Sequence, residues 1–227
     1  MEDIVQDVLQ KLHCKYPSES KGLVGVDKHY AHLESFMRIG SKEVGMIGIW
    51  GMGGIGKTTI ATSIFDHFSS QFEGCCFLEN IGDESEKHGL NFLHNKRLTM
   101  LLEEKENLHV GTVRIGFNYS KSKLSHKKVL IELDDVRTPE QLYFLVGART
   151  CSGPGSRVIV TARDNHTLIE RAREIYEVKP LNFHGSLKLF SLSAFKKLCP
   201  DIAYQQLSES VVNYTGGTLI SRNLDGF

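Results

Sequence analysis

Short apolar runs alternate with longer amphipathic stretches through the middle of the chain. The apolar runs have the length and composition of buried β-strands, and they cover residues 44–50, 74–81, 128–135, 157–164 and 175–178. Helical periodicity, with apolar residues every three or four positions, covers residues 28–39, 57–68, 90–107, 183–197 and 202–214. Because strands and helices alternate, we expect an α/β fold built on a parallel, doubly wound sheet.

Four other segments have less regular patterns. Residues 1–13 favour a short amphipathic helix, and residues 17–22 read as a linker because they combine proline, serine and glycine. A glycine followed by an acidic cluster at 82–86 predicts a loop. Residues 112–126 predict a weaker helix.

The first apolar run leads directly into a glycine-rich stretch. Residues 51–58 read GMGGIGKT and fit the phosphate-binding pattern G-x-x-x-x-G-K-[ST] between a strand and a helix. Glycines let the backbone N–H groups curl toward phosphate oxygens, and the helix N-terminus adds its positive dipole end. We expect Lys57 to reach the β- and γ-phosphates, where it serves both binding and catalysis, and Thr58 to ligate Mg²⁺. The alternative is a glycine-rich turn that fits the pattern by chance. The candidate nucleotide-binding residues in this stretch are Gly51, Gly53, Gly54, Ile55, Gly56, Lys57, Thr58 and Thr59.

The run at 128–135 (KVLIELDD) ends in two acidic residues, about 75 residues after the glycine-rich stretch. This is the Walker B arrangement, in which Asp134 would hold Mg²⁺. Asp135 is placed to orient or deprotonate an attacking water and is the second candidate catalytic residue. The alternative is that both aspartates cap the next helix, which residues 138–140 (TPE) are suited to start by themselves.

Arg163 follows another predicted strand. Parallel strands end at one edge of a sheet, where ligands bind, so Arg163 could contact a γ-phosphate and distinguish ATP from ADP. The alternative is a surface arginine paired with the neighbouring Asp164.

Glu132 is unusual because a central parallel strand is covered on both faces and is normally apolar throughout. It therefore finds a cation, stays protonated, or damages the strand. His29 and His32 lie three positions apart on a predicted helix, but no third ligand supports a metal site, and surface histidines are the simpler interpretation.

Composition places few further limits on function. Hydrophobic residues make up 41% and charged residues 24%, as in ordinary globular proteins. Lys+Arg and Asp+Glu both number 27, so overall charge gives no reason to expect a nucleic acid or an anionic membrane as partner.

The five cysteines include no C-x-x-C pair, which disfavours a disulfide framework or zinc ribbon. The acidic start and the lack of an apolar run of about 18 residues predict no signal peptide and no membrane span, hence a cytoplasmic location.

Five stretches carry a family resemblance: GMGGIGKTTIA (51–61), FLENI (77–81), KKVLIELDDV (127–136), GSRVIVTARD (155–164) and YEVKPLNFHGSLKLFSLSAF (176–195). With them the chain resembles, over about residues 22–217, the NB-ARC nucleotide-binding domain of plant disease-resistance proteins. The likeness is greatest to the class that carries an N-terminal TIR domain.

The resemblance implies a molecular switch that is resting with ADP, active with ATP, and reset by slow hydrolysis. It implies that Lys57 and Thr58 form the P-loop pair, Asp134 and Asp135 the Walker B pair, and Arg163 the sensor of the γ-phosphate. It further implies that the backbone of Val24 and Gly25 meets adenine. The implied domains are an N-terminal helix and linker (1–21), a P-loop nucleotide-binding domain (22–180) and the start of a helical ARC subdomain (181–227).

The chain departs from the family pattern at several positions. Glu132 replaces an aliphatic residue, Gly82 stands where an arginine is expected, and TARD replaces TTRD. The family's GGLPLA motif is represented by residues 216–221 (GGTLIS), which lack the proline. The family's later domains do not follow, so we expect a truncated member.

Three functions remain open from the sequence. The leading one is an ADP- or ATP-binding switch module of a plant immune receptor, with Mg²⁺ and at most slow ATP hydrolysis. The second is an ATPase or kinase with turnover of its own, although no arginine-rich lid stands out between the motifs. The third is a truncated, non-hydrolysing fragment that associates with full-length receptor chains.

Overall fold

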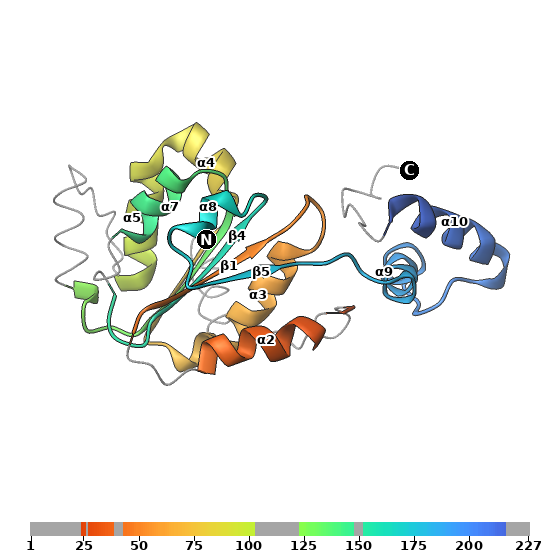
Figure 1. Cartoon of the computed structure of the whole chain (residues 1–227), viewed down its shortest axis with the longest axis horizontal. Helices are drawn as coiled ribbons and strands as arrows, with labels where there is room; N and C mark the ends of the chain where they lie inside the picture. The colour runs from red at the N-terminus through yellow and green to blue at the C-terminus, as the bar shows by residue number, and fades with distance from the viewer. Residues whose placement is uncertain (1–23, 26, 39–42, 103–122, 148–151, 217–227) are drawn as a thin grey trace, which may run out of the picture.

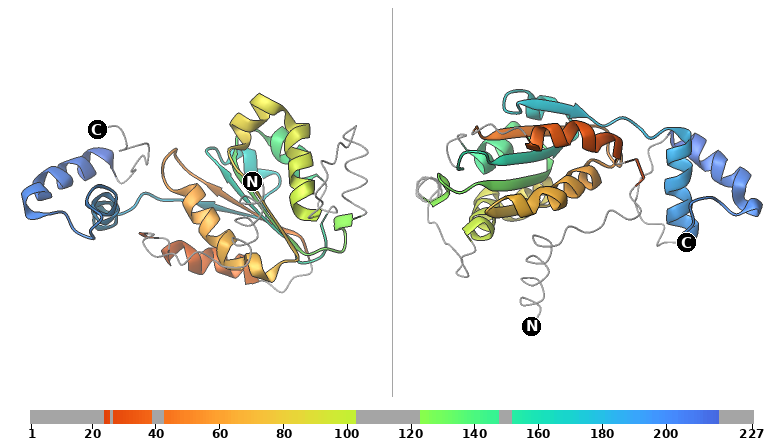
Figure 2. Two further views of the ribbon diagram at one scale, coloured as in Figure 1. Left: turned by 180° about the vertical axis from the view of Figure 1, so that it is seen from behind. Right: turned by 90° about the horizontal axis from the view of Figure 1, so that it is seen from below.

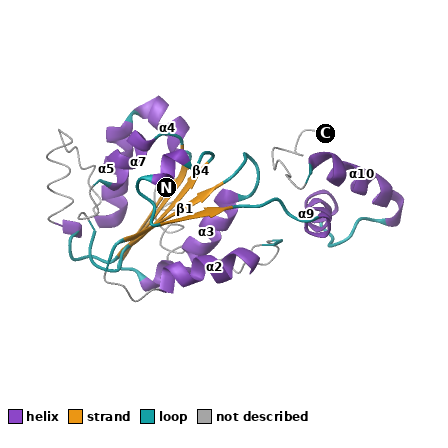
Figure 3. Cartoon of the chain, in the orientation of Figure 1, coloured by secondary structure: helices purple, strands orange, loops and turns teal. Residues whose placement is uncertain are grey.

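The computed structural model describes residues 24–25, 27–38, 43–102, 123–147 and 152–216. Within these residues the strands form one sheet, in the order β2-β3-β4-β1-β5, and every neighbouring pair is parallel. The strands are β1 (Gly45–Trp50), β2 (Gly74–Leu78), β3 (Val129–Val136), β4 (Arg157–Ala162) and β5 (Glu174–Glu177). The predicted parallel α/β architecture is therefore confirmed (Figure 3).

Helices cover both faces of this sheet (Figures 1 and 2). One face carries α2 (Asp27–Arg38) and α3 (Lys57–Phe68), which the 3₁₀ turn η1 (Ser69–Gln71) extends. The other face carries α4 (Ile81–His88), α5 (Leu90–Leu102), α7 (Pro139–Val146) and the short α8 (His166–Ile169). Beyond the carboxyl end of β5, Figure 1 shows α9 (Phe183–Phe195) and α10 (Gln205–Thr215), with the 3₁₀ turn η3 (Ile202–Tyr204) between them.

The strand sequences supply a separate core to each face, because successive side chains of a strand point in opposite directions. On β3, Ile131 and Leu133 pack into the core with α5 and α7, whereas Leu130 packs into the core with α2 and α3. Both sets are buried, which explains the near-continuous apolar runs in the sequence. Glu132 lies two residues from Leu130 and so belongs to the α3 side.

The loop predicted at residues 82–86 is wrong, because these residues belong to α4. Asp83 and Glu84 stand in the first turn of α4, and Lys87 and His88 stand in its last turn. This arrangement complements the helix dipole and favours the helix. The glycine that suggested a loop, Gly82, is a helical residue beside which the side chain of Arg137 packs.

The other predicted elements agree with the structure where it describes them. The helix predicted at 28–39 is α2, one residue earlier at each end, and the strand predicted at 74–81 ends at Leu78. The segments predicted at 1–13 and 17–22, and most of the one predicted at 112–126, lie outside the described residues. Among the described residues no helix is long and apolar enough to cross a membrane.

Candidate functional site

The candidate residues converge at the carboxyl edge of the sheet. Strands β3, β4 and β1 are consecutive neighbours, and Ala162 at the end of β4 is level with both Trp50 of β1 and Val136 of β3. The glycine-rich loop leaves β1 at this edge, the two aspartates end β3, and Arg163 follows β4. Parallel topology thus brings together residues more than a hundred positions apart in the sequence.

The glycine-rich loop needs backbone conformations that other residues rarely adopt. Gly54 has φ +75° and Gly56 has φ +98°, both in the left-handed region that favours glycine. Gly56 is also the N-cap of α3, and no side chain caps this helix N-terminus. The N–H groups of the first helical turn are therefore suited to receive an anion.

Lys57, the first residue of α3, is buried against the loop that precedes it. Its Nζ donates hydrogen bonds of 2.9 Å to the carbonyl oxygens of Gly51 and Met52. Burial lowers the pKa of Lys57, and the nearby Arg163 lowers it further, while Asp135 and Asp134 raise it. The charged groups that act on Lys57 are therefore three of the other candidate site residues.

Asp134 accepts hydrogen bonds from two hydroxyl groups, one on α3 and one on the neighbouring strand β4. Its Oδ1 accepts hydrogen bonds of 2.7 Å from Thr58 Oγ1 and of 2.7 Å from Thr161 Oγ1. Thr161, on β4, is a contact that the sequence analysis missed. The signal for it was a polar residue near the carboxyl end of an otherwise apolar strand.

Asp135 is held by two guanidinium groups. Its Oδ2 accepts from Arg137 Nε at 3.1 Å and Nη2 at 3.0 Å, and its Oδ1 accepts from Arg163 Nε at 3.2 Å. Its φ of +53° is unusual for a residue other than glycine. Its N–H donates to Thr161 Oγ1 at 2.9 Å, which helps to fix this conformation.

Two of the alternative contacts considered from the sequence are not formed in the structure. Arg163 pairs with Asp135, and Asp164 instead accepts a hydrogen bond of 2.9 Å from the backbone N–H of His166. The N-cap of α7 is Thr138, which forms a capping box with Gln141, so the two aspartates do not cap that helix. Arg137, which sequence reasoning also missed, stands one residue before this cap.

Val24 and Gly25, expected to meet adenine, immediately precede α2. Gly25 has φ +82°, and a Cβ atom on it would lie 2.6 Å from Leu181 Cδ2. The segment therefore packs closely against the chain just before α9. The adenine contact itself stays a prediction.

Glu132 is fully buried between β3 and α3. Its Oε1 accepts a hydrogen bond of 3.1 Å from Thr62 Oγ1, whereas its Oε2 has no hydrogen-bond partner within the described part of the chain. Burial raises the pKa of Glu132 well above its usual range; the hydrogen bond from Thr62 lowers it in part, and the nearby Asp134, Asp66 and Glu79 raise it further. Strand β3 is continuous through this position. Of the three alternatives, the protonated carboxyl is the one the structure favours.

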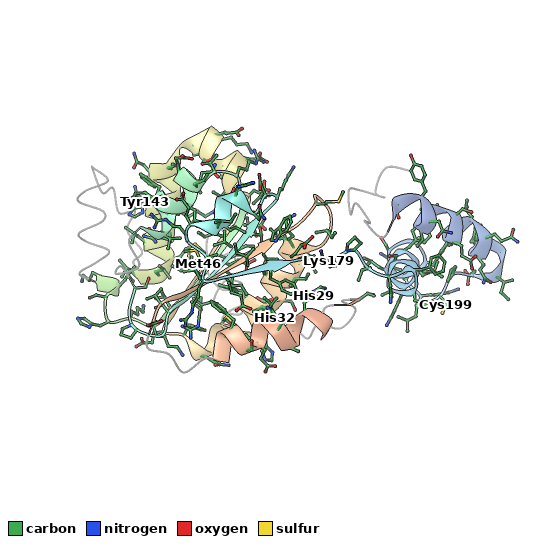
Figure 4. All side chains as sticks on the ribbon, viewed as in Figure 1. His29, His32, Met46, Tyr143, Lys179 and Cys199 are labelled. Carbon is green, nitrogen blue, oxygen red and sulfur yellow. The ribbon has the colours of Figure 1, made fainter. Side chains whose placement is uncertain are left out.

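His29 and His32 connect α2 to the edge strand β5 (Figure 4). His29 Nδ1 lies 2.6 Å from the hydroxyl of Tyr176, and His32 Nε2 lies 2.6 Å from Glu174 Oε1. Across the described residues, no group of three or more histidine, cysteine, aspartate or glutamate side chains is placed to hold a metal ion. The two histidines thus serve to dock α2 on the sheet.

Comparison with known sequences gives one family match and several relatives. The family described as "NB-ARC domain" matches residues 27–199. The TMV resistance protein N of Nicotiana glutinosa is 43% identical over 225 residues, which cover 96% of this chain and 19% of that protein. The disease resistance protein RUN1 of Vitis rotundifolia is 38% identical over 218 residues, which cover 96% of this chain and 16% of that protein. The chain thus spans less than a fifth of the length of these relatives.

Solved structures share the fold at low sequence identity. The structure of Cdc6p from Pyrobaculum aerophilum has a TM-score of 0.62 at 9% identity and covers 92% of this chain and 60% of that one. The Drosophila ORC structure bound to DNA has a TM-score of 0.57 at 15% identity and covers 93% of this chain and 56% of that one. At these identities the likeness concerns the fold alone.

Proposed function

The chain belongs to the NB-ARC family, and from this premise we propose that it is an adenine-nucleotide-binding switch module of a plant immune receptor. It binds ADP or ATP together with Mg²⁺ and hydrolyses ATP slowly at most. The observation that carries the proposal is the hydrogen bond between Thr58 and Asp134, which joins the glycine-rich loop to the end of β3 beside the buried Lys57.

The residues at this edge suit a magnesium nucleotide. Mg²⁺ prefers oxygen ligands, and the Thr58 hydroxyl and the Asp134 carboxylate stand 2.7 Å apart. Asp134 is buried, and the hydrogen bonds to its Oδ1 come from neutral hydroxyl groups. A bound cation would therefore balance the negative charge of this carboxylate. Bound Mg²⁺ would neutralise phosphate charge, while Lys57 and the N-terminus of α3 would hold the phosphate groups.

The remaining residues have proposed roles in sensing and hydrolysis. Arg163 would contact the γ-phosphate after leaving Asp135, and Asp135 would then orient the attacking water. Slow hydrolysis would agree with the pairing of Asp135 Oδ2 to Arg137, because after Arg163 leaves, Oδ1 is the carboxylate oxygen left to accept a hydrogen bond from water. Val24 and Gly25 would meet adenine.

The immune function is supported by the relatives, whose names describe disease resistance. For this chain we propose the domains given by the sequence: the nucleotide-binding domain at 22–180 and a helical unit from 181 onward. A second candidate function is association with other receptor chains without hydrolysis. It is favoured by large apolar side chains left exposed around α10, namely Ile202, Leu207 and Tyr214.

Calorimetric titration with ADP–Mg²⁺ and ATP–Mg²⁺ tests the proposal. Wild-type chain should bind both, and Lys57→Ala should abolish binding, because the phosphate charge loses its main side-chain partner. Lys87→Ala is the matched control, since it removes one lysine charge from the exposed surface of α4. Equal affinities in wild type and Lys57→Ala would refute the assignment, and rapid multiple-turnover release of phosphate would favour an ATPase over a switch.

A further inference from the structure

Arg137 contacts three carboxylate groups at the edge of the site. Its guanidinium reaches Asp135, described above, and two residues of α4: Nη1 donates to Glu86 Oε1 at 3.2 Å, and Nη2 donates to Asp83 Oδ1. Three carboxylates from two elements therefore surround one cation. Such a side chain is fixed in place more firmly than one held by a single contact.

The sequence makes room for this arrangement at Gly82. A Cβ atom on Gly82 would lie 2.1 Å from Arg137 Nε and 2.4 Å from its Cζ. Any larger residue at position 82 would therefore displace the guanidinium. Since Gly82 is helical and is not among the glycines with positive φ, alanine would suit the backbone there.

Arg163 holds Asp135 much less firmly. It contributes one hydrogen bond, from Nε to Oδ1, and its side chain is 62% exposed, compared with 33% for Arg137. Asp135 therefore has a fixed cation, Arg137, and an exchangeable one, Arg163. If Arg163 moved to a γ-phosphate, the carboxylate of Asp135 would still be neutralised by Arg137.

We propose that Arg137 is a specificity-determining residue that favours ATP over ADP, because it keeps Asp135 paired while Arg163 transfers to the γ-phosphate. The proposal rests on the nucleotide-binding function proposed above. Without Arg137, the transfer would leave Asp135 unpaired beside another anion, which is unfavourable. ADP has no γ-phosphate, so Arg163 stays paired with Asp135 when ADP binds. The affinity of the chain for ADP therefore does not depend on Arg137.

The test compares the dissociation constants of ADP–Mg²⁺ and of a non-hydrolysable ATP analogue with Mg²⁺, by calorimetry on the purified chain. Arg137→Ala should weaken binding of the analogue by about tenfold and leave binding of ADP unchanged. Gly82→Ala should have the same effect by displacing the guanidinium. The double variant should be no weaker than Arg137→Ala alone, and Lys87→Ala should change neither constant.

A second comparison separates the mechanism from a general effect of surface charge. In an Asp135→Asn background there is no carboxylate to compete for Arg163, so Arg137→Ala should no longer change the ratio of the two constants. Asparagine is tolerated at positive φ, so this background should fold. A ratio that still changes in the Asp135→Asn background would overturn the proposal.

The other outcomes are equally decisive. If wild type binds both nucleotides and Arg137→Ala weakens both equally or neither, then Arg137 has no role in specificity, while the nucleotide-binding function stands. If wild type binds neither nucleotide, the proposed function fails, and the role of Arg137 fails with it.

Discussion

Thr62 on α3 donates a hydrogen bond of 3.1 Å to Glu132 on β3, one helical turn after the Thr58–Asp134 pair. Four helical residues rise about 6 Å and two strand residues about 6.6 Å, so the same helix and strand can form two hydroxyl–carboxyl pairs in succession. The first pair lies at the candidate magnesium site. The second lies inside the core, where a carboxyl group is costly.

Replacing Glu132 with leucine should stabilise the fold. Leucine has a similar size and removes a buried oxygen that lacks a hydrogen-bond partner among the described residues, while Thr62 is only partly buried and can turn to solvent. We expect the free energy of unfolding to rise by about 1 kcal/mol, measured by urea denaturation. A less stable variant would mean that Glu132 contributes a favourable interaction to the fold.

Glu132 should also make stability depend on pH. Its pKa is raised in the folded state by burial, whereas in the unfolded chain it should be near the ordinary value of about 4.3. The proton held by the folded state contributes stability that is complete below pH of about 4.3 and is lost as pH rises toward the folded-state pKa, by at most about 1.4 kcal/mol per pH unit.

The measurement is urea denaturation of wild type and Glu132→Gln from pH 4 upward, without nucleotide or divalent cation. Glutamine cannot ionise, so the stability of wild type relative to the variant should decrease as pH rises. A constant difference would show that the pKa of Glu132 is the same in both states.

Adding a side chain at Gly48 should destabilise the fold. A Cβ atom there would lie 2.6 Å from Leu168 Cδ1, in the core beneath α8. Gly48→Ala should therefore cost about 1–3 kcal/mol of stability, measured by thermal or urea unfolding. In a Leu168→Ala background the contact of 2.6 Å with Leu168 Cδ1 is removed and only the contact of 3.1 Å with the Cβ of residue 168 stays, so the same substitution should cost less. An equal penalty in both backgrounds would place its origin elsewhere.

The hydroxyl group of Thr161 should contribute to the stability of the fold. That group donates to Asp134 and accepts from the N–H of Asp135, so Thr161→Val, which preserves shape, leaves both partners short of one hydrogen bond. We expect a loss of about 1–3 kcal/mol in unfolding free energy. Thr161→Ser keeps the hydroxyl and should retain most of the stability. Similar losses in the two variants would indicate a packing role instead.

The sequence predicts the five strands and their parallel arrangement, because each strand is a distinct apolar run that alternates with helical segments, but it does not predict the strand order. The loop predicted at residues 82–86 is wrong, because Gly82 lies in α4 and makes room for the side chain of Arg137. The sequence also could not pair Arg163 with Asp135, since such contacts depend on loop conformation and on the positive φ of Asp135. Thr161 was visible only as a polar residue in a strand.

The most direct test of the switch proposal is to purify the chain, denature it, and identify any released nucleotide by chromatography. If residues 24–216 form a nucleotide-binding fold, about one ADP or ATP per chain should be released. Added ADP–Mg²⁺ should also raise the melting temperature of any nucleotide-free fraction. If no nucleotide is released, and neither ADP–Mg²⁺ nor ATP–Mg²⁺ stabilises the folded chain, then this chain is not a nucleotide-binding switch.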